Sequence, residues 1–212
     1  PEAPDRHRVG GDSRALAIRQ ERIAVRGRDD VVLTVRETPH GPLVEELLPG
    51  ARPALAVAWG GAQPGDGVAA LLRAPLARSA QELRAVLAAH HEPVFVFAFA
   101  DATGRGGRQV AGWLPERSMP TGLVPVPGRS PWYDWRGRVS FDAMPYEALG
   151  DNGFLIAADN ALGGGPAIEW WWRSGERAAR IETLLREAHE RGPIGATALA
   201  AILADQRSAA AP

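Results

Sequence analysis

Histidines are the first side chains in this chain that could do chemistry, because an imidazole can act as a base or bind a metal. There are five: His7, His40, His90, His91 and His189. Neighbouring residues of a helix do not share a face, so His90 and His91 are not expected to bind one metal together. We expect this pair at a solvated helix end. The sequence has no His-x-x-x-His pair, acidic calcium loop or phosphate-binding glycine loop, and no metal site is predicted.

Covalent catalysis is restricted by the residue types that the chain lacks. All 24 basic residues are arginines and there is no cysteine, which excludes Schiff-base lysines, thiol nucleophiles and disulfides. The Gly-x-Ser-x-Gly motif of serine hydrolases does not occur either. The amine of Pro1 is not expected to act as a base, because the polar residues around it do not predict a buried terminus. Composition and periodicity alone predict an α+β domain with no catalytic group identified.

Charge and composition limit the partners of the chain. The net charge is −1 and the pI is about 6.6 for 212 residues, which gives no electrostatic basis for binding nucleic acid or an anionic membrane. No apolar run approaches the roughly 20 residues of a membrane-spanning helix, and no targeting signal is visible. The first methionine is Met119. We therefore expect a processed chain or an internal fragment of a longer protein.

Alternating apolar residues predict several strands. Glu21–Arg26 alternates as a half-buried strand does, and Val31–Glu37 is expected to return beside it as a hairpin. Val94–Ala100 is the strongest strand pattern, with Gln109–Leu114 as its partner after a turn at Asp101–Gly104. Further strands are expected at Ala54–Trp59, which reads as buried, and at Phe154–Ala158, and an extended path is expected for Leu43–Leu48.

Helices are expected where apolar residues recur every three or four positions. Ser79 and Glu82 have the spacing of a capping box before a helix that ends near His90. Glu176–His189 and Thr197–Ala204 predict two more helices. Residues 1–13 are expected to be irregular, and residues 115–150 to form a long ordered loop. This order of elements favours an α+β fold with antiparallel sheets.

A series of short motifs is more specific than any single residue. In chain order it contains Thr38-Pro-His-Gly-Pro42, Phe97-Ala-Phe-Ala-Asp101, Ala111-Gly-Trp-Leu-Pro115, Leu123-Val-Pro-Val-Pro-Gly128, Trp132-Tyr-Asp-Trp-Arg-Gly137, Phe141-Asp-Ala-Met-Pro145, Asn152-Gly-Phe-Leu-Ile-Ala-Ala-Asp-Asn160 and Gly175-Glu-Arg-Ala-Ala-Arg-Ile181. This series resembles the β subunit of the penicillin acylase family of N-terminal-nucleophile amidohydrolases, from about Ile23 to the end of the chain. The resemblance implies part of a four-layer αββα sandwich with antiparallel sheets, and residues 1–212 as a single partial domain.

The resemblance also implies an activity. Family members hydrolyse linear amides, such as penicillin or cephalosporin side chains or N-acyl homoserine lactones, through a nucleophile at the start of the β subunit. That residue, the α subunit and the first part of the β subunit are expected to lie outside this chain, which alone should be inactive. No cofactor is expected to be required, although some members bind a structural calcium. A periplasmic or secreted location is expected for the full-length protein. The alternative is a catalytically silent relative that serves as a binding scaffold.

Site residues follow from the resemblance position by position. The family places an oxyanion-stabilising asparagine where this chain has Asp159, followed by Asn160. Three interpretations stay open: Asp159 is held protonated, or Asn160 serves after a local rearrangement, or the protein is an altered acylase in which the pair only ends a strand. Arg177 matches an arginine that orients the family asparagine, and Trp171, within Trp170-Trp-Trp172, is expected at an acyl pocket or packed under a helix. His40 is expected to have a structural hydrogen-bonding role.

Overall fold

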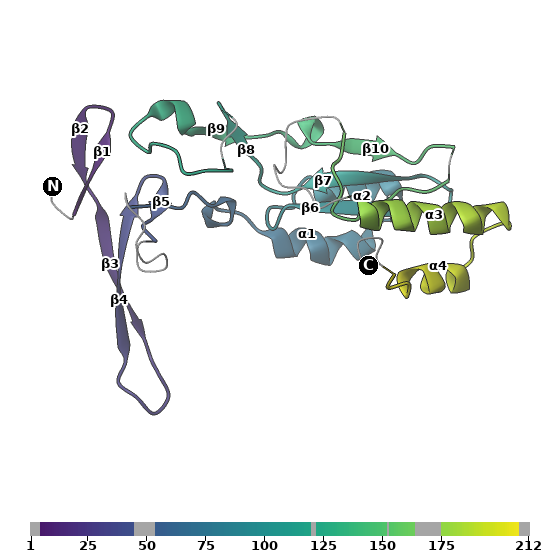
Figure 1. The fold of residues 1–212 in the computed structure, drawn as a ribbon, viewed down its shortest axis with the longest axis horizontal. Helices are drawn as coiled ribbons and strands as arrows, with labels where there is room; N and C mark the ends of the chain where they lie inside the picture. Colours follow the sequence, from purple (N-terminus) through teal and green to yellow (C-terminus); the bar gives the residue numbers. More distant parts are fainter. Residues whose placement is uncertain (1–4, 45–53, 120–121, 152, 164–174, 208–212) are drawn as a thin grey trace. The chain divides into compact units, whose positions relative to one another are not determined.

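The architecture follows from a computed structural model of the chain, which describes residues 5–44, 54–119, 122–151, 153–163 and 175–207. The chain divides into two units: Pro1–Gln63 with Pro115–Arg138, and Pro64–Leu114 with Val139–Pro212. Every pairing between described strands is antiparallel, and helices accompany the sheet of the second unit (Figure 1). The predicted α+β class with antiparallel sheets is therefore confirmed. The single partial domain stays a prediction.

Hairpins dominate the first unit. β1 (Arg6–Val9) pairs with β2 (Asp12–Ala15), so the irregular structure expected for residues 1–13 is wrong where it is described. Gly10, at a φ of 60°, supplies the left-handed turn that joins the two strands. β3 (Ala17–Ile23) pairs with β4 (Val31–Thr38) from Ala17↔Glu37 to Ile23↔Val31. This confirms the predicted hairpin, although its first strand begins and ends earlier than the expected Glu21–Arg26.

The β3–β4 hairpin is exposed rather than half-buried. Every residue of β3 is solvent-exposed, and Ile23 and Val32 are 49% and 57% accessible. The alternation that predicted a buried face is present, but no described element covers that face. The sequence pattern was correct for the strands and wrong for the burial of this hairpin.

Short elements complete the first unit. β5 (Gly41–Pro42) returns beside the end of β4, and beyond it Leu43 forms an isolated bridge with Ala56. The buried strand expected at Ala54–Trp59 is therefore reduced to a single bridge, and these residues are mostly exposed. Of the extended path expected for Leu43–Leu48, only Leu43 and Val44 are described. A Cβ at Gly41 would overlap the Val57 carbonyl, so a glycine is required at this close approach.

Residues 115–150 were expected to form a long loop, and that expectation is wrong. β8 (Pro115–Arg117) pairs with β9 (Trp135–Arg138) in the first unit, and β10 (Tyr146–Ala148) joins the sheet of the second unit. Two short 3-10 turns, Pro131–Tyr133 and Phe141–Ala143, lie between these strands. Strands this short, between prolines and glycines, carry little periodic signal in a sequence.

The second unit is built on a sheet with the strand order β10-β7-β6. β6 (Phe95–Ala100) and β7 (Gly106–Ala111) form the predicted hairpin with the turn at Asp101–Gly104. The hydrophobic core at this sheet contains buried Val110, Leu114 and Met144, with partly buried Val94, Val96, Val139 and Leu162 packed against them. β7, paired on both sides, is the central strand.

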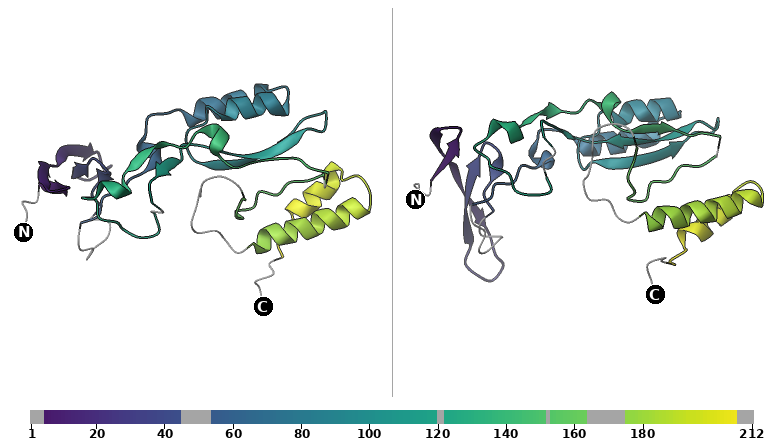
Figure 2. Two further views of the ribbon diagram at one scale, coloured as in Figure 1. Left: turned by 90° about the horizontal axis from the view of Figure 1, so that it is seen from above. Right: turned by 45° about the horizontal axis from the view of Figure 1, so that its top comes forward.

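Helices of the second unit largely follow the prediction. α2 (Ala80–Leu87) is capped by Ser79, whose hydroxyl accepts from the Glu82 N–H at 3.1 Å, and the Glu82 carboxylate accepts from the N–H of Arg78. α3 (Glu176–Glu190) and α4 (Ala196–Leu203) lie side by side (Figure 2). The sequence did not predict α1 (Gly67–Arg73), which Asp66 caps. None of the described helices combines the length and the apolar character needed to cross a membrane.

The expectation of a solvated His90–His91 pair is wrong, because both residues are buried. The His90 ring lies 2.7 Å from the Pro93 carbonyl through Nε2 and 3.3 Å from the Gly67 carbonyl through Nδ1, and it packs against Phe95 and Phe97. The His91 ring occupies the space that a Cβ at Gly65 would need. The chain turns inward after α2 to enter β6, which brings these rings into the core instead of into solvent.

Asp101 ties the β6–β7 turn to the start of α2. Its carboxylate accepts from the Thr103 hydroxyl and from the backbone N–H groups of Ala80, Thr103 and Arg105. The Thr103 hydroxyl, followed by the Ala80 N–H, lowers the pKa of Asp101 to about 2 from an ordinary value of 3.8.

Acid should therefore remove a stabilising contribution of Asp101. Because its pKa is lower in the folded state, the contribution is complete above about pH 4 and is lost as the pH falls toward 2. We expect Asp101→Asn to lower the melting temperature of the full-length protein at pH 6, and the gap to the wild type to close between pH 4 and pH 2, in calorimetry. Asp29→Asn, in the exposed turn of the β3–β4 hairpin, is the control. A gap that is constant with pH would contradict this prediction.

Arg84 joins α2 to the sheet through a buried amide. Its Nε donates to Oε1 of fully buried Gln109 at 2.9 Å, and its Nη2 donates to Asp142 at 3.2 Å. The guanidinium also lies over the rings of Phe141 and Tyr146, 5.1 and 4.7 Å from their centroids. One side chain thus connects α2, β7 and the segment that leads into β10.

Removal of this guanidinium should weaken the sheet. Arg84→Met keeps an apolar stem but leaves the buried Oε1 of Gln109 without that donor, which costs about 2–3 kcal/mol. The measurement is the opening free energy of the β7 amides, from hydrogen exchange of the full-length protein. Arg22→Met, which breaks an exposed pair with Asp30, should cost less than about 1 kcal/mol. Equal effects of the two variants would show that Arg84 contributes no more than a surface pair.

Candidate active site

The segment that carries Asp159 and Asn160 is not a strand. Residues 153–160 run between β10 and α3 without strand pairing, so the strand expected at Phe154–Ala158 is wrong. Asp159 has a φ of 56°, and among described residues it is the only one other than glycine in the left-handed region. Asp and Asn tolerate that conformation better than most residues. The strict alternation of a strand therefore does not govern where the side chains at 159 and 160 point.

Asp159 and Arg177 lie together, as the resemblance led us to expect. Arg177 is in the first turn of α3, and its Nη1 is 3.0 Å from Oδ2 of Asp159, 18 residues earlier in the chain. The side chain of Arg177 is 67% accessible and that of Asp159 is 64% accessible. An exposed pair of this kind adds little to stability.

Asn160 is oriented by the backbone of neighbouring residues. Its Oδ1 accepts from the Ala158 N–H at 3.0 Å, and its Nδ2 donates to the Ala161 carbonyl at 3.3 Å. An amide nitrogen carries two hydrogens, and among the described residues only the Ala161 carbonyl accepts one of them. Asp159 in its ionised form has no N–H to offer. Of these two neighbours, Asn160 is therefore the one that can donate to a developing negative charge.

Two arginines that sequence reasoning missed also hold the 153–160 segment. Nη1 of Arg108, on β7, donates to the Ile156 carbonyl at 2.6 Å, and the guanidinium of Arg186, on α3, lies 5.9 Å from the Phe154 ring centroid. Arg108 and Ile156 are 48 residues apart, and a contact over that sequence distance cannot be predicted from a local sequence pattern. The Arg186 position could have been inferred only after α3 was placed beside the segment.

The remaining site predictions have different outcomes. Trp171, with the rest of Trp170-Trp-Trp172, lies outside the described residues, and its substrate-binding role stays a prediction. His40 has the structural bond expected of it, with Nε2 2.8 Å from the Gly128 carbonyl and Nδ1 3.7 Å from the Asp134 carboxylate. Among the described residues no group of His, Asp and Glu side chains could hold a metal. The calcium that the resemblance allows for the full-length protein stays untested.

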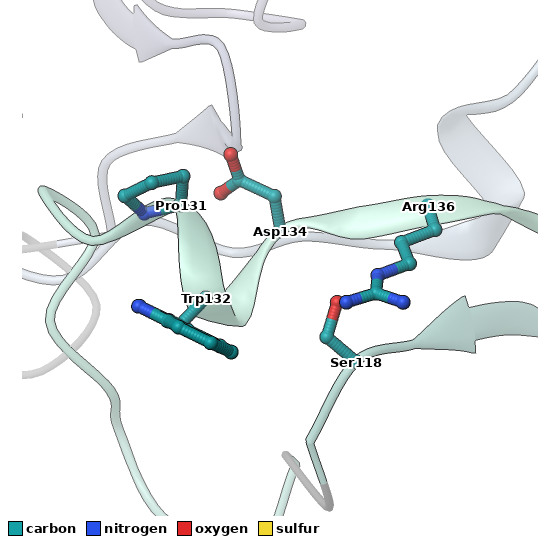
Figure 3. Close-up of a pocket in the computed structure, with 5 residues that line it drawn as sticks. All are labelled: Ser118, Pro131, Trp132, Asp134 and Arg136. Carbon is teal, nitrogen blue, oxygen red and sulfur yellow. The ribbon is translucent and has the colours of Figure 1, made fainter.

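A shallow pocket in the first unit is lined by Ser118, Pro131, Trp132, Asp134 and Arg136 and has a volume of about 250 Å³ (Figure 3). Arg136 and Ser118 point toward one another across it, whereas the Asp134 carboxylate turns away from them. The Trp132 indole supplies an apolar wall, although the residue is 68% accessible. The pocket contains none of Asp159, Asn160 and Arg177, and it is not part of the candidate active site.

The polar group at 159–160 can therefore stabilise charge but cannot start a reaction. It offers an amide N–H, a guanidinium and a carboxylate, which suit the stabilisation of an oxyanion and the orientation of a polar substrate. Within the described residues it contains no serine, threonine or histidine that could act as a nucleophile or a base. A nucleophile from elsewhere would be required for hydrolysis.

Comparisons with known proteins agree on one family. The family model described as "Penicillin amidase" matches residues 1–212. The chain is 31% identical over 157 residues to penicillin acylase 2 proenzyme of a Pseudomonas species, covering 73% of this chain and 20% of that protein. It is 33% identical over 186 residues to the acyl-homoserine lactone acylase QuiP of Pseudomonas syringae pv. tomato, covering 79% and 21%. The chain thus spans about a fifth of these curated relatives.

A solved structure supports the fold. A thermostable penicillin G acylase from Alcaligenes faecalis superposes with a TM-score of 0.72 at 24% identity, over 87% of this chain and 34% of that chain. At this level of identity the likeness shows the fold alone. The predicted fold, an α+β part of an N-terminal-nucleophile hydrolase sandwich with antiparallel sheets, is confirmed.

Proposed function

The chain belongs to the penicillin amidase family, and from that premise we propose that it is an internal part of the β subunit of an enzyme that hydrolyses linear amides. Its relatives are acylases that act on penicillin-type or acyl-homoserine lactone substrates by name. We propose small amides of these two kinds as substrates. The α subunit and the start of the β subunit are the proposed partners, and a periplasmic or secreted location is proposed for the full-length protein.

The observation that carries the proposal is the Asp159–Arg177 pair with Asn160 beside it. These residues occupy the positions at which the family resemblance places its oxyanion-stabilising group, and α3 brings Arg177 to within 3.0 Å of Asp159. Two segments that the resemblance predicts to cooperate are thus in contact. This supports the assignment of the site, although Asp159 itself departs from the family pattern.

The proposed reaction is acyl transfer in two steps. A Ser, Thr or Cys at the start of the β subunit attacks the amide carbonyl, and its proton passes through the α-amine to the leaving amine. Water then hydrolyses the acyl-enzyme and releases the acid. In both steps the carbonyl oxygen becomes an oxyanion that needs hydrogen-bond donors. No cofactor is required by this scheme.

Asn160 is the proposed donor to the oxyanion from this chain. Its Nδ2 has a second N–H that no described residue accepts, and its Oδ1 is fixed by the Ala158 N–H. Asp159 then serves to hold Arg177, which balances the negative charge that the carboxylate brings to the site. Trp171 is proposed to line the acyl pocket.

A second function is favoured by Asp159 itself. A carboxylate in place of the family asparagine repels an oxyanion, and the loss of one donor in other hydrolases slows the reaction by a factor of about 100 to 1,000. A silent relative that uses the scaffold only for binding would tolerate this replacement. The two functions differ in the residue that begins the β subunit.

The first experiment therefore examines the full-length protein. We expect its purified form to contain a β subunit that begins with Ser, Thr or Cys, as found by mass spectrometry and N-terminal sequencing, and to release acid from phenylacetyl or acyl-homoserine lactone amides. The isolated 212-residue chain should release none, because nucleophile and base are both missing. A full-length protein that stays uncut and inactive would favour the silent scaffold, and activity of the isolated chain would contradict the proposed mechanism.

Substitutions at the two neighbouring positions separate the interpretations of Asp159. In the full-length enzyme we expect Asn160→Ala to lower kcat about 100- to 1,000-fold, because the oxyanion loses a donor, and Asp159→Asn to change it less than about tenfold. Steady-state kinetics between pH 6 and pH 9 are the measurement. If instead Asp159→Asn raises the rate, most strongly at high pH, and Asn160→Ala has little effect, position 159 faces the oxyanion and our assignment is wrong.

A further inference from the structure

Arg108 makes a partly buried polar contact to the segment that carries the candidate site. Its Nε and Nη2 both donate to Oε2 of Glu147, at 2.8 and 2.5 Å, and its Nη1 donates to the Ile156 carbonyl at 2.6 Å. The Arg108 side chain is 18% accessible, compared with 67% for Arg177. A hydrogen bond from a charged donor gains strength where water is partly excluded.

The sheet holds the Arg108 guanidinium in place from two sides. Arg108 lies on central strand β7, and Glu147 is its direct partner across the β10–β7 pairing. The carboxylate engages one edge of the planar guanidinium, so that a nitrogen on the other edge is directed at Ile156. A lysine could not serve both partners with this geometry, because an ammonium group lacks the fork of a guanidinium.

The Ile156 carbonyl is three residues from Asp159, and the chain between them has little freedom. Ala158 is buried, and its N–H is held by the side chain of Asn160. No described strand pairs with residues 153–160, so the sheet reaches this segment through side chains rather than through a backbone ladder. The position of the Asp159–Asn160 turn therefore depends on where the Ile156 carbonyl is anchored.

We propose that Arg108, oriented by Glu147, is a positioning residue for the Asp159–Asn160 turn. It acts through the Ile156 carbonyl and touches no reacting group. Its consequence for catalysis rests on the proposed function, whereas its hold on the segment does not. A misplacement of about 1 Å at a catalytic group lowers a rate about 100-fold, so loss of this anchor should appear in kcat.

The test compares Arg108→Lys with Arg84→Lys in the full-length protein. Both variants keep the charge and weaken an arginine contact at β7, but Arg84 bonds Gln109 and Asp142 and, within the part of the chain that the structure describes, no hydrogen bond or ion pair joins it to residues 153–160. For Arg108→Lys we expect faster hydrogen exchange in residues 153–160, a kcat lowered about 10- to 100-fold and a KM within about threefold of the wild type. Arg84→Lys should lower the melting temperature while exchange in residues 153–160 and kcat stay at wild-type values.

Glu147→Gln is the second variant, because it leaves Arg108 intact and removes only the charge that orients it. We expect Glu147→Gln to speed exchange in residues 153–160 and to lower kcat, both by less than Arg108→Lys does. Wild-type exchange of residues 153–160 in Arg108→Lys would overturn the proposal, and so would faster exchange with an unchanged kcat. If the wild-type enzyme hydrolyses no amide, the proposed function fails, and the exchange rates still decide whether Arg108 anchors the segment.

Discussion

Alternation of side chains along β7 is the constraint on which the second unit depends. Successive residues of a strand face opposite sides of the sheet, so Arg108 and Gln109 reach different partners. Gln109 bonds Arg84 of α2, whereas Arg108 bonds Glu147 and the segment that leads to Asp159. A slip of one residue in the pairing of β7 would exchange the two side chains and detach both the helix and the segment.

Polar groups rather than apolar contacts specify the register of this sheet and the elements that pack on it. Gln109 is fully buried, yet its amide donates to the carbonyls of Val110 and Pro145 and accepts from Arg84. Because buried polar atoms are costly when they lack partners, this arrangement favours one register over its neighbours. The absence of lysine in the chain is consistent with this use of arginine, since a planar guanidinium can bond two groups in fixed directions.

Local patterns predicted most of the regular structure. Periodicity and capping signals, which involve residues close together in the sequence, predicted two hairpins and three helices: β3–β4, β6–β7, α2, α3 and α4. The pair of Asp159 and Arg177 was accessible only through the family resemblance. The anchor at Ile156, the inward turn of His90 and the left-handed Asp159 were not, because each depends on elements distant in sequence or on a backbone state that no composition announces.

The left-handed backbone at Asp159 has an evolutionary consequence. A φ of 56° suits aspartate, asparagine and glycine and strains branched residues, so this position is open to very few residue types. Aspartate and asparagine differ by one atom and, in the genetic code, by one base. The charge at this turn can therefore change in a single mutational step without rebuilding the backbone.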